Sequence, residues 1–372
     1  MSSPLSEVVA LASRLIALDT RSSRSNRGLA DLIVSELPEF AVERLDFTDP
    51  EGVEKTALVA LRGQAGGCLA FSAHMDTVPP VGWARDPFQP AVQDNRLYGL
   101  GSCDMKGPMA AAIVAARSLP ADRAVMLLLT CDEETTKAGA RRIVAESQML
   151  KTHPPAGILV AEPTNLRPLR GHRSDVQFTV TARGIQAHSS TADGLNANIA
   201  LIPFLSEMRD IYLTLRADPR FQDPSYVPPW CDLNIIVDNH GTATNITAPL
   251  ATCRMKFRYS KAIDPMWVIE RVETAARRQG LDLVVRQEGT PPELAIEHPL
   301  VQLAASVTAA SPDVGAFGSD GSQFAAVAPT LILGPGSMEQ AHRPEEFIDL
   351  EQLERSVLIF QKLATALAMV AR

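Results

Sequence analysis

Short apolar runs alternate with longer helical stretches along the first 171 residues. The runs "TALVALR", "CLAFSAH", "AVMLLLT" and "AGILVAE" have the length and composition of buried strands. Stretches between them, such as "GPMAAAIVAARSL", have a helical pattern. This alternation predicts an α/β fold in which a mixed sheet lies between layers of helices.

The pattern changes between residues 176 and 287. Segments there follow the order strand, helix, strand, strand, helix, strand, which is typical of a ferredoxin-like βαββαβ module. After residue 290 the α/β pattern returns, with "PTLILGP" as a strand and "LEQLERSVLIFQKLATALAMV" as a long helix. We therefore predict a discontinuous α/β domain over residues 1–173 and 289–372, with a smaller domain inserted over residues 174–288.

Length, charge and cysteine content narrow the class of protein. A chain of 372 residues exceeds what one core usually supports, which agrees with two domains. The 35 basic and 43 acidic residues give a net charge of −8, which argues against nucleic acid and anionic membranes as partners. The first residues lack signal-peptide features, and no apolar run approaches the roughly 18 residues of a membrane span. Five cysteines without a CxxC pair indicate free thiols in a reducing cytoplasm.

Acidic residues gather directly after one predicted strand. Asp132, Glu133 and Glu134 are adjacent in "TCDEETT", at the end of the apolar run 124–129. Partly buried carboxylates are unfavourable unless a cation, a proton or a donor compensates them. Two other strands also end in polar residues, in "SAHMD" and "AEPT", and the carboxyl ends of such strands form one edge of the sheet. We therefore expect a positively charged species at this edge.

Several residues near this edge have the chemistry of metal ligands. In "HMD", His74 and Asp76 lie on the same side of an extended segment, a spacing that suits an imidazole ligand held by a carboxylate. Two imidazoles and three carboxylates can hold two zinc-like ions roughly 3.5–4 Å apart if one carboxylate bridges them. The five candidate ligands are His74, Asp104, Glu134, Glu162 and His342.

Six motifs along the chain resemble, in the same order, those of the M20 family of dizinc metallopeptidases and deacylases. They are "SAHMDTVP", "GLGSCDMKGPMAA", "DEETTKAGA", "AEPTN", "QAHSS" and "LGPGSMEQAHRPEEF". Within that family, "GWARDPF" and "GPGSMEQAHRPEEF" are most similar to the acetylornithine deacetylase branch, which is related to succinyl-diaminopimelate desuccinylase and carboxypeptidase G. The resemblance implies a catalytic domain with two Zn²⁺ per chain, for which Co²⁺ can substitute. It also implies that the inserted domain is a lid through which the chain forms a homodimer.

The resemblance assigns a role to each residue of the metal site. His74 and Glu162 would hold one zinc, Glu134 and His342 would hold the other, and Asp104 would bridge the two. A non-proline cis peptide is implied directly after the bridging residue.

Two further acids receive catalytic roles from the resemblance. Asp76 would orient the imidazole of His74. Glu133 would be the general base, taking a proton from the attacking water and giving it to the leaving amine. Of the two adjacent glutamates, one would therefore be a ligand while its neighbour moves protons.

Substrate contacts are implied in the inserted domain and near residue 320. His188 would reach the neighbouring subunit's site and stabilise the oxyanion. Arg258 would bind a substrate carboxylate, with Asn245 as its companion. Ser319 and Asp320, in "GSDGSQF", are as similar to desuccinylases as to deacetylases, and Asp320 is a candidate for contact with the substrate side chain.

These features predict a cytoplasmic dizinc amidohydrolase that acts on a small N-acyl amino acid. The first choice of substrate is N-acetyl-L-ornithine, cleaved to acetate and L-ornithine in arginine biosynthesis. N-succinyl-diaminopimelate, N-acetylcitrulline and a dipeptide stay open as alternatives. The alternative from another class is a non-catalytic protein that binds metal or an amino acid. Glu133 argues against it, because a binding protein needs the ligands but not the base.

Overall fold

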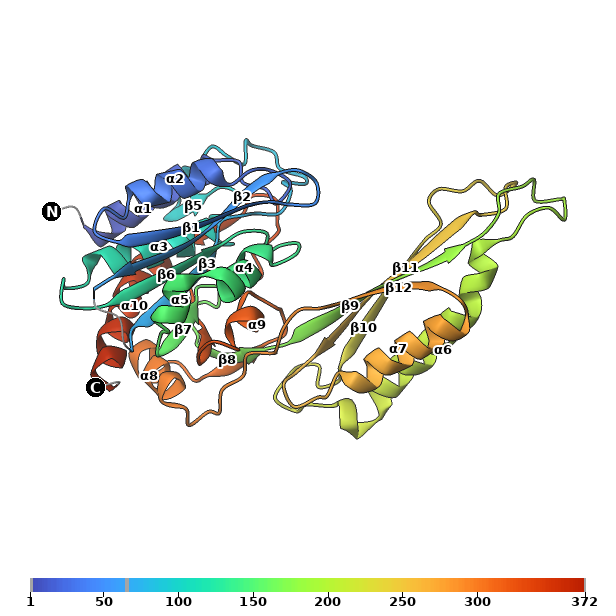
Figure 1. The fold of residues 1–372 in the computed structure, drawn as a ribbon. Helices are drawn as coiled ribbons and strands as arrows, with labels where there is room; N and C mark the ends of the chain where they lie inside the picture. Colours follow the sequence, from blue (N-terminus) through green and yellow to red (C-terminus); the bar gives the residue numbers. More distant parts are fainter. Residues whose placement is uncertain (1–2, 64–66, 371–372) are drawn as a thin grey trace. The chain divides into compact units, whose positions relative to one another are not determined.

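The computed structural model describes residues 3–63 and 67–370, and the chain divides into two compact units. Unit 1 comprises the residues up to His172, Pro292–Val314 and the residues from Ser319 on. Unit 2 comprises Arg173–Pro291 and Gly315–Gly318. Unit 1 therefore contains both the blue and the red ends of the chain in Figure 1.

The unit boundaries differ slightly from the predicted insertion of residues 174–288. Unit 2 begins one residue earlier, ends three residues later and also includes Gly315–Gly318. The backbone N–H of Arg173 donates to the carbonyl of Gly315 at 3.4 Å, so the chain at residue 315 lies beside the start of this unit. This contact joins positions distant in sequence, which explains why local patterns did not indicate it.

Unit 1 is built on a mixed eight-stranded sheet, in the order β1-β2-β6-β3-β7-β14-β8-β13. The central strands β6, β3, β7 and β14 are parallel to one another, whereas the pairs β1–β2, β2–β6 and β14–β8 are antiparallel. The central strands are buried along their whole length, as their apolar runs predict. The strands are β1 (Ala41–Thr48), β2 (Glu54–Arg62), β3 (Leu69–His74), β6 (Val125–Thr130), β7 (Gly157–Val160), β8 (Leu169–His172), β13 (Asp313–Gly315) and β14 (Thr330–Ile332).

Helices cover both faces of this sheet (Figure 1). Helices α1, α3 and α10 pack against one another and share an apolar core with β3 and β6, whereas α4 packs on β6 and β2. The connections β3-α3-β6 and β6-α4-β7 run in opposite directions along the sheet, so right-handed crossovers place α3 and α4 on opposite faces. The helices are α1 (Pro4–Ile16), α2 (Arg27–Ser35), α3 (Lys106–Ser118), α4 (Ala138–Glu146), α5 (Gln148–Thr152), α8 (Pro299–Thr308), α9 (Gly321–Phe324) and α10 (Leu350–Val370).

A small three-stranded sheet also belongs to unit 1. Its order is β15-β5-β4, and both pairings are antiparallel. It joins a hairpin that precedes α3 to the segment that precedes α10, which are far apart in sequence. The strands are β4 (Ala91–Gln93), β5 (Arg96–Tyr98) and β15 (Phe347–Asp349).

Unit 2 has the predicted βαββαβ order, and its four strands form an antiparallel sheet in the order β10-β11-β9-β12. This is the ferredoxin-like arrangement, so the predicted fold class is confirmed for both parts of the chain. Alternate residues of β9 and β11 face α6 and α7 and form a separate apolar core. The elements are β9 (Ser174–Arg183), α6 (Ala197–Ala217), the 3-10 helix η1 (Pro219–Phe221), β10 (Asp232–Asp238), β11 (Leu250–Tyr259), α7 (Met266–Arg278) and β12 (Asp282–Gln287). Within the described ranges, we find no helix with the length and apolar character of a membrane span.

Candidate metal centre

The five predicted ligands come together at the carboxyl edge of the parallel strands in unit 1. His74 is the last residue of β3, Glu134 follows β6, and Glu162 follows β7. Asp104 lies in the loop before α3, and His342 lies in the segment before β15. Because β3, β6 and β7 are neighbouring parallel strands, their carboxyl ends necessarily meet at this edge.

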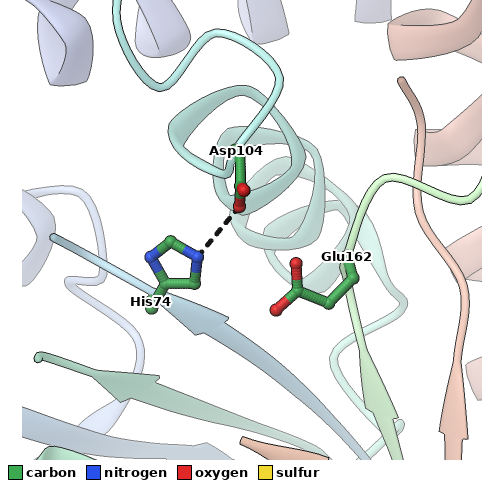
Figure 2. A group of neighbouring side chains, drawn as sticks. All are labelled: His74, Asp104 and Glu162. Atoms are coloured by element: carbon green, nitrogen blue, oxygen red, sulfur yellow. Dashed lines mark hydrogen bonds and ion pairs between the residues drawn. The ribbon is translucent and has the colours of Figure 1, made fainter. Parts of the chain in front are cut away.

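The ligands form two groups of three that share Asp104. In the first group, His74, Asp104 and Glu162 are all buried, and the potential ligand atoms lie within 4.8 Å of one another. His74 Nε2 is 3.0 Å from Asp104 Oδ1, and Figure 2 shows the Glu162 carboxylate turned toward the same space. In the second group, His342 Nε2 lies 2.9 Å from Glu134 Oε1 and 3.5 Å from Asp104 Oδ2. Asp104, for which the resemblance implies a bridging role, is the residue common to both groups.

The electrostatics of these groups favour a bound cation. Burial raises the pKa of Glu162 well above its usual range and that of Glu134 to about 7, and the nearby Asp104 charge acts in the same direction. Hydrogen bonds to Asp104 and Glu134 raise the pKa of His342 to about 10. Three carboxylates therefore lie close together in a buried space, where their negative charges need protons or cations to compensate them. With two imidazoles completing the donor set, the residues fit two divalent ions that share one carboxylate.

Asp76 holds the acidic loop as well as lying near His74. Its two carboxylate oxygens accept hydrogen bonds from the backbone N–H groups of Glu133, at 3.1 Å, and Glu134, at 3.2 Å. His74 Nδ1 lies 2.9 Å from the main-chain carbonyl of Asp76 and 3.7 Å from its carboxylate. The closest contact of the imidazole is therefore with the backbone carbonyl of Asp76, whereas the sequence predicted a contact with its carboxylate. The side chain instead sets the direction of the next two acids.

Each of the three adjacent acids has its own positive partner or donor. Asp132 Oδ1 accepts from the buried Lys55 Nζ at 2.7 Å, and Glu133 pairs with Lys137. Only Glu134 belongs to a group of potential ligands. The three acids after β6 thus have different surroundings: Asp132 is in a buried ion pair, Glu133 lies outside both ligand groups, and Glu134 is a candidate ligand. Neither lysine was predicted to take part: Lys55 lies in no motif, and Lys137 lies within "DEETTKAGA" but received no role.

The peptide bond between Asp104 and Met105 is cis, as the resemblance implies.

Asp320 lies inside unit 1, close to the end of β6. Its Oδ2 accepts from Thr130 Oγ1 at 2.5 Å, and its Oδ1 is buried with no hydrogen-bond partner among the described residues. Burial and then the Glu133 charge raise its pKa to about 7. The preceding Ser319 Oγ lies 2.7 Å from His172 Nε2. Asp320 is therefore close to Glu133, and its carboxylate is enclosed.

The three residues for which the resemblance implies substrate contacts, His188, Asn245 and Arg258, all lie in unit 2. His188 and Asn245 are neighbours, because His188 pairs with Ile246 in an isolated bridge and Ser189 N–H donates to the Asn245 carbonyl at 3.0 Å. The His188 side chain is exposed, with Nδ1 2.7 Å from Ser190 Oγ. Arg258 is half-buried on β11 and points to the face opposite the apolar core, since Phe257 before it is buried in that core.

Comparisons with known proteins agree with this fold and site. Residues 70–366 match the family described as peptidase family M20/M25/M40. An acetylornithine deacetylase of Photorhabdus laumondii is 31% identical over 347 residues, which is 90% of this chain and 89% of that protein. One of Myxococcus xanthus is 30% identical over 381 aligned residues, covering 95% of this chain and 96% of that protein.

Solved structures share the fold at low sequence identity. An M20 family metallo-carboxypeptidase, Sso-CP2 of Sulfolobus solfataricus, is 16% identical, with a TM-score of 0.78 over 99% of this chain and 100% of that one. The YXEP protein of Bacillus subtilis, described as a dinuclear metal-binding peptidase, is 17% identical, with a TM-score of 0.63 over 98% of each chain. The chain belongs to peptidase family M20/M25/M40, as its motifs predict. It is a hydrolase that acts on amide bonds.

Proposed function

We propose that the chain is a two-metal deacylase of small N-acyl amino acids and that its substrate is N-acetyl-L-ornithine. The observation that carries this proposal is the pair of ligand groups sharing Asp104, with the uncoordinated Glu133 directly beside the ligand Glu134. The substrate is supported by relatives named acetylornithine deacetylase, which are 30–31% identical over about nine-tenths of the chain. The products would be acetate and L-ornithine.

Zinc is the metal we propose, with cobalt as a substitute. His74 and Glu162 would hold one ion, His342 and Glu134 the other, and Asp104 both; imidazole and carboxylate donors suit Zn²⁺. Two such ions would supply Lewis acidity to the scissile carbonyl and to the attacking water.

The proton transfers would fall to Glu133. Water adds to the acyl carbon as Glu133 takes its proton, and the amide C–N bond breaks as Glu133 delivers that proton to the leaving nitrogen. The base is held in place through its backbone, because Asp76 accepts from the N–H groups of Glu133 and Glu134. Lys137 pairs with the Glu133 carboxylate and would help to orient it.

Substrate recognition would use residues of both units. We propose that Arg258 and Asn245 bind the substrate α-carboxylate, that His188 stabilises the oxyanion in the site of the partner subunit, and that Asp320 contributes near the substrate side chain. Unit 2 would then be both lid and dimerisation domain. Five buried cysteines without disulfides support a reducing cytoplasm as the location of the enzyme. The proposed reaction would belong to arginine biosynthesis.

The test is hydrolysis of N-acetyl-L-ornithine by purified protein, with acetate and ornithine both quantified. Activity should disappear after chelation and return with Zn²⁺ or Co²⁺, with close to two ions per chain at full activity. A panel containing N-succinyl-diaminopimelate, N-acetylcitrulline and dipeptides decides the substrate by kcat/KM. Full activity with one ion per chain would overturn the two-metal proposal, and a higher kcat/KM for another panel member would overturn the substrate.

A further inference from the structure

A buried glutamate outside the proposed ligand set holds the loop that presents Asp104. Glu346 is 1% exposed, and its carboxylate accepts three hydrogen bonds from backbone N–H groups of that loop. Oε1 accepts from Cys103 at 2.7 Å and from Asp104 at 2.8 Å, and Oε2 accepts from Gly101 at 2.9 Å. One of the three donors is therefore the backbone of the shared ligand itself.

The main chain of Glu346 fastens the same loop. Its carbonyl accepts from Gly99 N–H at 3.1 Å, and the next residue begins β15, where Phe347 pairs with Tyr98 of β5. The ladder between β5 and β15 thus ends at Glu346, and the side chain continues the pairing around residues 101–104. Buried backbone N–H groups need an acceptor, so these donors would be left unpaired if the Glu346 carboxylate were removed and the loop stayed in place.

This arrangement connects two ligands of the second group. Glu346 contacts the loop of Asp104, and the same segment carries His342 four residues earlier. The third member, Glu134, is held separately by the Asp76 carboxylate. The buried carboxylates of Asp76 and Glu346 therefore hold the backbone of the two ligand loops. Glu346 is the one that links the loop of Asp104 to the segment that carries His342.

We propose that Glu346 is a positioning residue that sets Asp104 and His342 at the separation that the second ion needs. The inference rests on the proposed two-metal site and adds to it a residue that contacts neither metal nor substrate. Groups that hold metal ligands in place typically change metal affinity by about 10–100-fold when they are replaced.

The chain offers a matched control in the adjacent residue. Glu345 is in the same segment and pairs with Arg85 at 2.5 Å, and its side chain is 35% exposed. Glu345→Gln therefore makes the same chemical change one residue away without touching the 101–104 loop. Glu346→Gln replaces one acceptor oxygen with an amide donor, and Glu346→Asp keeps the carboxyl group but shortens its reach.

The experiment measures metal binding, independently of turnover. Metal-free protein is titrated with Co²⁺ and with Zn²⁺ against a competing chelator, and circular dichroism reports folding of each variant. We expect parent and Glu345→Gln to bind two ions alike. Glu346→Gln should bind one ion nearly as the parent does and the other at least roughly tenfold more weakly. Glu346→Asp should also lose affinity for that ion, because a shorter side chain cannot reach all three N–H groups.

Three results would overturn the inference. The first is parental affinity for both ions in Glu346→Gln. The second is full affinity in Glu346→Asp, which would mean that the reach of the carboxyl group to the loop does not matter. The third is loss of folding in both variants, which would give Glu346 a role in the fold rather than in positioning ligands. Failure of the two-metal proposal would be seen separately, as fewer than two ions bound by the unmutated chain.

Discussion

Glu133 and Glu134 are adjacent in sequence, but their carboxylates have different partners. Their backbone N–H groups both donate to Asp76, so the two residues are fixed in one orientation. The Glu134 carboxylate then lies beside His342, and the Glu133 carboxylate lies beside Lys137. The backbone anchor therefore directs one acid into a ligand group and keeps the other outside it.

Replacing Glu133 should separate catalysis from metal binding. Because Glu133 belongs to neither ligand group, Glu133→Gln should retain both ions and lose roughly 10²–10⁴-fold in kcat. Steady-state kinetics and metal analysis on the same preparation measure both quantities. Glu134→Gln is the comparison, and it should lose metal affinity together with rate. A near-parental kcat in Glu133→Gln would show that another group is the base.

Arg258 should act on substrate binding more than on turnover. If it binds the α-carboxylate before and during reaction, its contact lowers KM without raising kcat. A charged hydrogen bond contributes about 1.5–3 kcal/mol, so Arg258→Ala should raise KM roughly tenfold or more. Arg254→Ala is the control, since Arg254 lies on the same face of β11 and is more exposed.

The α-carboxamide of the substrate completes this test. It should bind the parent about as poorly as the acid binds Arg258→Ala, and it should lose little more in the variant. If Arg258→Ala still discriminates acid from amide as the parent does, the carboxylate receptor lies elsewhere.

At the scale of elements, the acidic loop depends on how closely α4 approaches the end of β6. Gly139, in the first turn of α4, packs against Cys131. A Cβ at this position would lie 2.4 Å from the Cys131 nitrogen and 2.8 Å from its oxygen. No side chain fits there unless the helix or the loop moves, so the position of Glu133 and Glu134 relies on this glycine.

Gly139→Ala should therefore impair the site from a distance. Overpacking of this kind costs about 1–3 kcal/mol, and a displacement of the loop by about 1 Å can cost about a hundredfold in rate. We expect a lower melting temperature and a kcat reduced by that order. Gly28→Ala is the matched control, because a Cβ in α2 there meets nothing within 4 Å. Parental kcat in Gly139→Ala would mean that the loop does not depend on this contact.

In unit 1, local patterns were sufficient to predict β2, β3, β6, β7 and β14 and the edge at which strand ends meet, and the candidate ligands were placed there. Apolar runs such as 124–129 report burial directly, and parallel strands bring their ends together without further information. The contacts that hold the site in place could not be predicted from local patterns. Lys55 and Asp132 are 77 residues apart, and Glu346 and Asp104 are 242 apart. Such pairs form only after the strands have been ordered, and a motif that contains one member does not indicate its partner.

At the scale of the whole molecule, each unit has its own apolar core. One core lies under α1, α3 and α10, and the other lies between the β9–β12 sheet and the helices α6 and α7. The proposed metal ligands all belong to unit 1. Metal should therefore stabilise one unit and leave the other unchanged.

Calorimetry of the full chain with and without chelator tests this. Ligand at 1,000 times its dissociation constant stabilises by about 4 kcal/mol, so chelation should lower the melting temperature of one transition by several degrees. The second transition, assigned to unit 2, should stay in place. Asp104→Asn is the control, since loss of the shared ligand should remove the response to chelator. A single transition that shifts as a whole would show that the two units unfold together.

The position of β14 in the sheet has a consequence for the order in which a growing chain can fold. β14 lies between β7 and β8, although both of these strands precede unit 2 in sequence and β14 follows it. During synthesis, the βαββαβ segment is complete by residue 287, while the gap beside β7 stays open until residue 332 has emerged. Unit 2 can therefore fold on the ribosome while β7 still has an unpaired edge. An exposed strand edge of this kind is prone to pair with other chains. His342 is made later still, so the metal centre is among the last parts of the nascent protein to form.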